Sequence, residues 1–276
     1  MPPGVVAAVL LSALLHAGWN ALLRNSTDRS WAVGWIGVST MIVCAPLLPF
    51  VGWPASVWPL MLVSSAFHVV YLLLLAQAYR HSELSFAYPI ARGSSPMLVT
   101  IGGLLIASEH PSPLQAAGTV AVVLGIVALG LDSQAWDQAG FRVALAIGVV
   151  IAAYTVIDGI AVRRSGMPTQ YNLWCFSLYG LTMLLIQLKT RGAKALAGDP
   201  KQIGLVFGGG VISVVAYAIV TWAMVHAPMG MVSALRETST LFAALLGFLF
   251  LKERFSWKKL AFCSSIAAGA VIIGLS

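Results

Sequence analysis

Apolar segments of about twenty residues follow one another along the chain, separated by short polar turns. A helix of that length spans the hydrocarbon core of a bilayer. Helices are the expected form, because lipid offers the peptide backbone no hydrogen-bond partners. We therefore predict an all-α membrane protein with ten transmembrane helices, at about residues 4–23, 31–50, 56–79, 84–107, 113–131, 140–162, 169–188, 202–226, 229–251 and 256–275.

Composition agrees with this pattern. Of the 276 residues, 59% are hydrophobic and only 9% are charged, which is too few charges for a soluble domain of this length. The net charge of +7 is spread over short loops. Lysines and arginines placed in this way orient a membrane protein, so we expect no nucleic-acid partner and a lipid bilayer as the surroundings.

The second half of the chain repeats the first in weaker form. Arg92, Ser95 and Glu109 recur 144 residues later as Arg236, Ser239 and Glu253. Five predicted helices in each half give an odd number, so the two halves must insert with opposite orientations. This is the inverted repeat of many secondary transporters. We predict a first five-helix repeat at residues 1–135 and a second at residues 136–276.

Two arginines within the predicted helices are the strongest functional signal. A charge near mid-bilayer is costly, so such a residue normally faces a partner or a watery cavity. Arg92 and Arg236 approach the midplane from opposite sides, and two guanidinium groups facing one cavity suit a carboxylate or phosphate. Glu237 follows Arg236 directly, and a purely structural buried pair is the alternative interpretation.

Other polar side chains mark the same helices. His16 and Asn20 are four residues apart, and so are Tyr154 and Asp158, which places each pair on one helix face. These four residues join the arginines and Glu237 as candidates for substrate binding. The remaining candidates are His68, Tyr71, Ser95, Tyr217 and Ser239.

Signals for other functions are weak or missing in the sequence. The three cysteines fall inside apolar segments without metal-ligand spacing, and no HExxH or GxSxG motif occurs. We therefore expect no enzyme, no metal site and no cofactor. The sequence also has no nucleotide-binding motif, so transport would have to run on a gradient.

The five-plus-five repeat resembles the drug/metabolite transporter superfamily, and within it the ten-helix EamA-type transporters. The shared ends of the fourth and ninth predicted helices carry this resemblance: Arg92-Gly-Ser-Ser-Pro with Ala-Ser-Glu109-His-Pro-Ser, and Arg236-Glu-Thr-Ser-Thr with Leu-Lys-Glu253-Arg-Phe-Ser. The resemblance implies a bundle around a central cavity, with the fifth and tenth helices at the periphery. It also implies export or exchange of small metabolites or drugs.

Orientation stays open at this stage. Twelve of the 16 lysines and arginines fall in the loops after the odd-numbered helices, which places both termini outside the cytoplasm. The family resemblance implies that both termini are cytoplasmic.

The sequence favours a secondary transporter that moves a small anionic or zwitterionic metabolite by alternating access across the inner or plasma membrane. Coupling to protons would require a titratable group in the cavity, for which His16, Asp158 and Glu237 are candidates. The alternative is a multidrug exporter of cationic or amphipathic compounds, which would use Glu237 and Asp158 together with aromatic side chains such as Trp19. Either a monomer or a homodimer fits the sequence.

Overall fold

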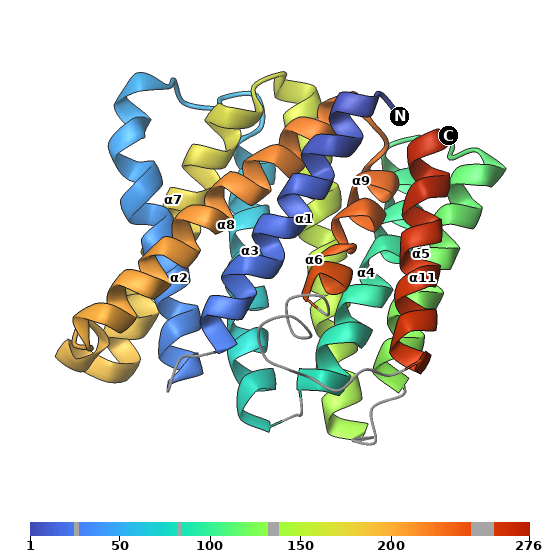
Figure 1. Ribbon diagram of the computed structural model, residues 1–276. Coiled ribbons are helices and arrows are strands. Elements are labelled where there is room, and N and C mark those ends of the chain that lie inside the picture. Colours follow the sequence, from blue (N-terminus) through green and yellow to red (C-terminus); the bar gives the residue numbers. More distant parts are fainter. Residues whose placement is uncertain (25–27, 82–83, 132–137, 244–256) are drawn as a thin grey trace.

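The computed structural model describes residues 1–24, 28–81, 84–131, 138–243 and 257–276, and within these ranges the regular structure is helical (Figure 1). The longer helices run roughly along one direction, as expected for a membrane bundle. Their bounds are α1 (Pro3–Arg24), α2 (Arg29–Cys44), η1 (Ala45–Phe50), α3 (Trp58–His81), α4 (Leu84–Ile106), α5 (Pro113–Leu131), α6 (Gln138–Ser165), α7 (Pro168–Arg191), η2 (Gly192–Ala195), α8 (Pro200–His226), α9 (Met229–Arg236) and α11 (Trp257–Leu275).

Six of the described segments are long and apolar enough to cross a membrane, and three shorter apolar helices accompany them. Large apolar side chains on the outer helices, such as Leu104, Leu124, Leu185 and Val271, are exposed rather than packed in a core. A lipid environment explains this exposure, because lipid tails solvate such side chains. The chain is therefore a multi-pass membrane protein.

Local sequence signals set several helix ends. The side chains of Asp28 and Asp199 accept hydrogen bonds from the backbone N–H groups of Trp31 and Lys201 and so cap α2 and α8. α7 ends at Gly192, which has φ +58°. These signals explain why most predicted boundaries lie within a few residues of the observed ones.

Helices α5 and α11 pack against each other at one edge of the bundle (Figure 1). A Cβ atom at Gly125 would lie 2.8 Å from the backbone oxygen of Phe262, and one at Gly118 would lie 3.0 Å from that of Gly269. The two backbones therefore approach closely only because glycine stands at these positions. The Ser265 hydroxyl also donates to the backbone oxygen of Ala121 at 2.9 Å.

The remaining helices pair across the two halves of the chain. α1 packs on α8, α3 packs on α6, α2 packs on α7, and α4 packs on both α6 and α9. If α1 to α5 correspond to α6 to α11, the α1–α8 pair is equivalent to the α6–α3 pair. The α2–α7, α4–α9 and α5–α11 pairs would then lie across a two-fold axis.

The ninth predicted helix is not continuous, which corrects the expectation of one unbroken helix over 229–251. α9 ends at Arg236, residues 237–238 form a turn, and helical structure resumes at 239–243. The N–H of Thr240 bonds to the oxygen of Glu237 at 3.0 Å, an i→i−3 bond that tightens the backbone here. Glu253, which belongs to the predicted repeat, lies outside the described residues.

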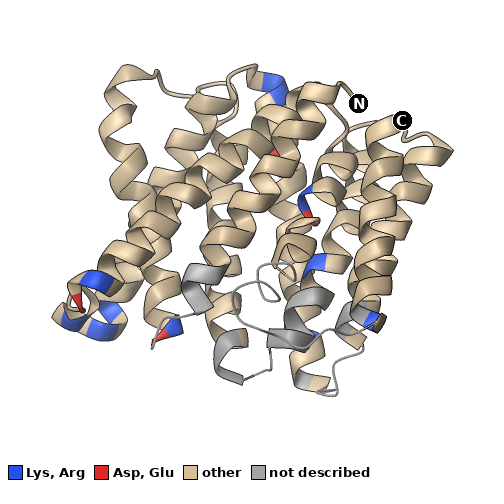
Figure 2. Cartoon of the chain, viewed as in Figure 1, with Lys and Arg blue, Asp and Glu red and all other residues tan. Residues whose placement is uncertain are grey.

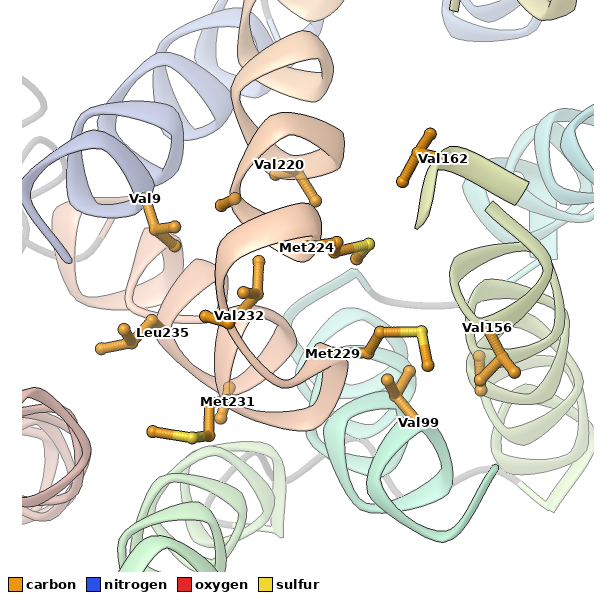
Figure 3. Close-up of a cluster of buried hydrophobic side chains, with 14 of the residues drawn as sticks. Val9, Val99, Val156, Val162, Val220, Met224, Met229, Met231, Val232 and Leu235 are labelled. Carbon is orange, nitrogen blue, oxygen red and sulfur yellow. The ribbon is translucent and has the colours of Figure 1, made fainter. Parts of the chain in front are cut away.

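The first half of the broken helix, α9, is buried among its neighbours. Met229, Val232 and Leu235 lie in an apolar cluster with side chains of α1, α4, α6 and α8 (Figure 3). At its start, the Glu109 carboxylate accepts a hydrogen bond from the N–H of Met229 at 2.8 Å. Arg163 of α6 contacts the same carboxylate at 2.6 Å and donates to the backbone oxygens of residues 224 and 227 at the end of α8.

Figure 2 shows most of the described lysines and arginines at the end of the bundle opposite to both termini. Few charged segments lie at mid-height, where a bilayer core would be. Those few include the residues of the candidate site.

Candidate functional site

A cavity of about 60 Å³ lies between the helices. This is room for a few water molecules, so a metabolite would require the walls to move apart. Side chains of eight helices form its walls: Ser12, His16 and Trp19 of α1, Ile36 of α2, His68, Tyr71 and Leu72 of α3, Arg92 of α4, Tyr154 of α6, Phe176 and Tyr179 of α7, Ser213, Ala216, Tyr217 and Val220 of α8, and Arg236 at the end of α9.

Arg92 and Arg236 meet at Glu237. The Arg92 Nε atom lies 2.6 Å from one carboxylate oxygen of Glu237, and the Arg236 Nη2 atom lies 3.5 Å from the other. Arg92 also donates to the Ser239 hydroxyl at 3.2 Å. All three charged side chains are buried. Two cations and one anion leave a local excess of one positive charge.

The ion cluster lies where α9 ends. Glu237, which follows the last residue of α9, still has a helical backbone, and its two carboxylate oxygens contact different arginines. Nε and Nη2 of Arg236 have no hydrogen-bond partner among the described residues, although only 3% of this residue is exposed. Arg236 also lines the cavity, and Nη2 has only the ion-pair contact with Glu237 described above.

Asp158 forms a second polar centre, away from the arginines. It is fully buried and accepts hydrogen bonds from the hydroxyl groups of Ser64, Tyr171 and Tyr217, the last two at 2.6 and 2.5 Å. These donors come from three helices, α3, α7 and α8. Three hydroxyl donors stabilise a carboxylate, which can only accept.

His68 lies between the cavity and Asp158. Its ring stacks on Tyr154 at a centroid distance of 4.1 Å and on Tyr179 at 5.2 Å. Tyr217 meets it edge-on at 5.5 Å. His68 Nε2 is 4.0 Å from an oxygen of Asp158. An imidazole is thus held between two tyrosine faces and next to a carboxylate.

The predicted site residues divide into two groups. The cavity wall contains seven of them, namely His16, His68, Tyr71, Arg92, Tyr154, Tyr217 and Arg236. The other five lie outside the wall. Asp158, Glu237 and Ser239 do not line the cavity but contact residues that do: Asp158 and Ser239 through hydrogen bonds, and Glu237 through an ion pair. The side chains of Ser95 and Asn20 donate hydrogen bonds to backbone oxygens of their own helices.

The sequence prediction missed the contribution of α7. Phe176 and Tyr179 line the cavity, and Tyr171 binds Asp158. Tyr171 and Tyr179 are eight residues apart, close to two helical turns, so a search for polar residues at helical spacing could have found this face. Phe176 gives no such signal, because an aromatic residue in an apolar segment resembles any other core residue.

Comparison with known proteins adds a family and a fold. The profile of the EamA-like transporter family matches residues 138–275. No curated protein matches the chain. A protein of known crystal structure is similar in fold, with a TM-score of 0.75 over 97% of this chain and 94% of the other, at 16% sequence identity.

Proposed function

Because the chain belongs to the EamA-like transporter family, and so to the membrane transporters of the drug and metabolite kind, we propose that it exports or exchanges a small anionic or zwitterionic metabolite. The substrate would bind in the central cavity, with an anionic group at Arg236 and Arg92. The observation that carries this proposal is the excess positive charge of the cluster, together with the position of Arg236 on the cavity wall and the absence of a hydrogen-bond partner for its Nε and Nη2 atoms among the described residues. Arginine presents these donors in a fork that matches carboxylate and phosphate.

Alternating access is the mechanism that we propose for this site. The cavity walls come from both halves of the chain, and the helix pairs follow the pattern expected of two related halves. Both observations support the two repeats at residues 1–135 and 136–276. The helix break beside the charged cluster also supports alternating access at this site, since transporters commonly bind substrate at discontinuous helices.

The aromatic lining favours a second candidate function. Trp19, Tyr71 and Phe176 would suit an amphipathic or cationic drug through stacking and cation–π contacts. Asp158 does not line the cavity, however, and its oxygens already accept three hydroxyl donors. We therefore rank a multidrug exporter second.

A thermal-shift screen of the purified protein separates the two functions. A ligand that binds the folded state raises its apparent stability by mass action. We expect stabilisation by carboxylates, phosphates or zwitterions at two pH values, and loss of this effect in Arg236→Lys. Arg164→Lys, on an exposed arginine outside the cavity, is the matched control. Stabilisation by organic cations alone would favour the exporter.

Three further features belong to the proposal. The transporter would lie in the inner or plasma membrane, would run on an ion gradient, and would act as a monomer or a homodimer. Uptake by proteoliposomes in the presence and absence of a pH gradient tests the second of these features.

A further inference from the structure

The hydrogen bonds of His68 determine which of its nitrogens carries the hydrogen. Nδ1 lies 3.0 Å from the backbone oxygen of Ser64. A carbonyl oxygen only accepts hydrogen bonds, so Nδ1 must donate. The Ser64 hydroxyl, which is also near Nδ1, gives its own hydrogen to Asp158. In neutral His68, Nε2 is therefore a bare acceptor.

This bare acceptor faces another acceptor. Nε2 lies 4.0 Å from Oδ2 of Asp158, so two lone-pair-bearing atoms oppose each other in a buried place. A proton on Nε2 would convert this opposition into an ion pair. The tyrosine faces on both sides of the ring would add a cation–π contribution, because their centroids lie within about 6 Å.

Charged and titratable groups on every neighbouring element bear on this site. Asp158 and Tyr154 approach His68 from α6, Tyr179 from α7 and Tyr217 from α8. Arg236 of α9 is the cation that acts on His68 from a greater distance. The negative charge of Asp158 thus favours a protonated His68, whereas the positive charge of Arg236 opposes it.

The other titratable groups are less suited to bind a proton. His16 is subject to the positive charges of both Arg92 and Arg236, which oppose a further positive charge on its ring. The two carboxylate oxygens of Glu237 already contact the same two arginines, at 2.6 and 3.5 Å. Asp158 has its oxygens filled by hydroxyl donors, whereas His68 has an acceptor nitrogen with no donor in the described contacts and also lines the cavity.

We propose that His68 Nε2, backed by Asp158 and enclosed by Tyr154 and Tyr179, is the proton-binding site of this transporter. The proton enters from water in the cavity and binds to the imidazole, which becomes an imidazolium without breaking another bond. The described hydrogen bonds and ion pair of His68 involve no arginine, so the proton site and the arginine cluster are made of different residues.

The two sites share a link through Arg236, and this part rests on the proposed function. An anion bound to Arg236 offsets the positive charge that opposes the imidazolium. Anion and proton therefore strengthen each other's binding, and by thermodynamic necessity they do so to the same extent. Such coupling would carry both across the membrane in the same direction.

Histidine NMR tests the proton site without any substrate. The protein carries five histidines, so ¹³C,¹⁵N-histidine labelling gives few signals, and His68→Gln identifies the one of interest. We expect His68 to gain a proton on Nε2 as the pH falls within the range in which the protein stays folded. Asp158→Asn should weaken proton binding at least about tenfold, because the partner charge is lost at close range.

Two further variants keep the test decisive if Asp158→Asn does not fold. Tyr217→Phe removes a donor from the oxygen that faces His68, and Arg236→Gln removes the opposing charge, so each should strengthen proton binding. The exposed His226 lies outside this site, and its signals are the internal control. A His68 that stays neutral down to the lowest pH at which the protein is folded, or that titrates identically in all three variants, would overturn the proposal while leaving the anion site untouched.

Discussion

At the residue scale, the burial of Asp158 determines which of its neighbours matter for stability. The groups that donate hydrogen bonds to its carboxylate are hydroxyls, and not a lysine or arginine, among the described contacts. Each hydrogen bond to a charged group contributes roughly 1.5–3 kcal/mol. The tyrosines around it therefore support the fold as well as the cavity.

Removal of one hydroxyl donor should be measurable. We expect Tyr171→Phe to lower the free energy of unfolding by roughly 1.5–3 kcal/mol, because the buried carboxylate loses a donor that water does not replace. Thermal unfolding in detergent measures this. Tyr71→Phe is the control, since no hydrogen bond joins its hydroxyl to Asp158 among the described contacts. Equal stability of the two variants would contradict the assigned role.

The candidate residues that the sequence identified share one property, which is that a charged or polar group stands out in an apolar segment. Arg92 and Arg236 were recognisable for this reason, and both line the cavity. Phe176 was not recognisable, because its role depends on which face of α7 turns inward. That choice is made by packing between helices and leaves little trace in one sequence.

At the element scale, the helices were predictable from apolar length, but the break in the ninth was not. Neither glycine nor proline marks the turn at residues 237–238. The hydroxyls of Thr238 and Thr240 donate to backbone oxygens three residues earlier, at 2.7 and 2.8 Å. Such bonds compete with helical hydrogen bonding. The sequence shows these residue types, whereas only the fold shows which bonds they make.

The contacts at the start of α9 give a prediction for this element. Arg163→Ala should lower stability by about 1–3 kcal/mol, because backbone oxygens at the end of α8 and the Glu109 carboxylate all lose a donor. Arg164→Ala removes an exposed arginine from the same turn and is the control. Thermal unfolding of both variants compares them directly. A larger loss in Arg164→Ala would show that the charge of this turn, and not the bonds, stabilises the helix.

At the scale of the whole molecule, both termini lie at one end and most of the described lysines and arginines lie at the other (Figure 2). Basic residues favour the cytoplasmic side. The expectation from charge is therefore that both termini lie outside the cytoplasm, against the orientation implied by family resemblance.

Reporter fusions decide between these orientations. We expect alkaline phosphatase fused after Ser276 to be active, because this enzyme folds only outside the cytoplasm. A fusion after Ala197, in the basic connection between α7 and α8, is the control and should be inactive. The reverse pattern would show that the family orientation holds despite the charges.

The central claim is that Arg92 and Arg236 bind the substrate and do not merely neutralise Glu237. Removal of one member of a buried ion cluster costs about 3–5 kcal/mol, so Arg236→Ala alone should reduce the amount of folded protein. Arg236→Ala with Glu237→Ala removes both charges and should restore membrane expression. In the binding interpretation, this double variant still does not transport.

The most direct measurement is uptake into proteoliposomes of the metabolite found in the thermal-shift screen. We expect Arg92→Lys and Arg236→Lys to fold but to bind at least about tenfold more weakly, because lysine keeps the charge and loses the planar fork. Both alanine double variants, Arg236→Ala/Glu237→Ala and Arg92→Ala/Arg236→Ala, should show no uptake. Full uptake by Arg92→Ala/Arg236→Ala would contradict the account, whatever the stability of that variant.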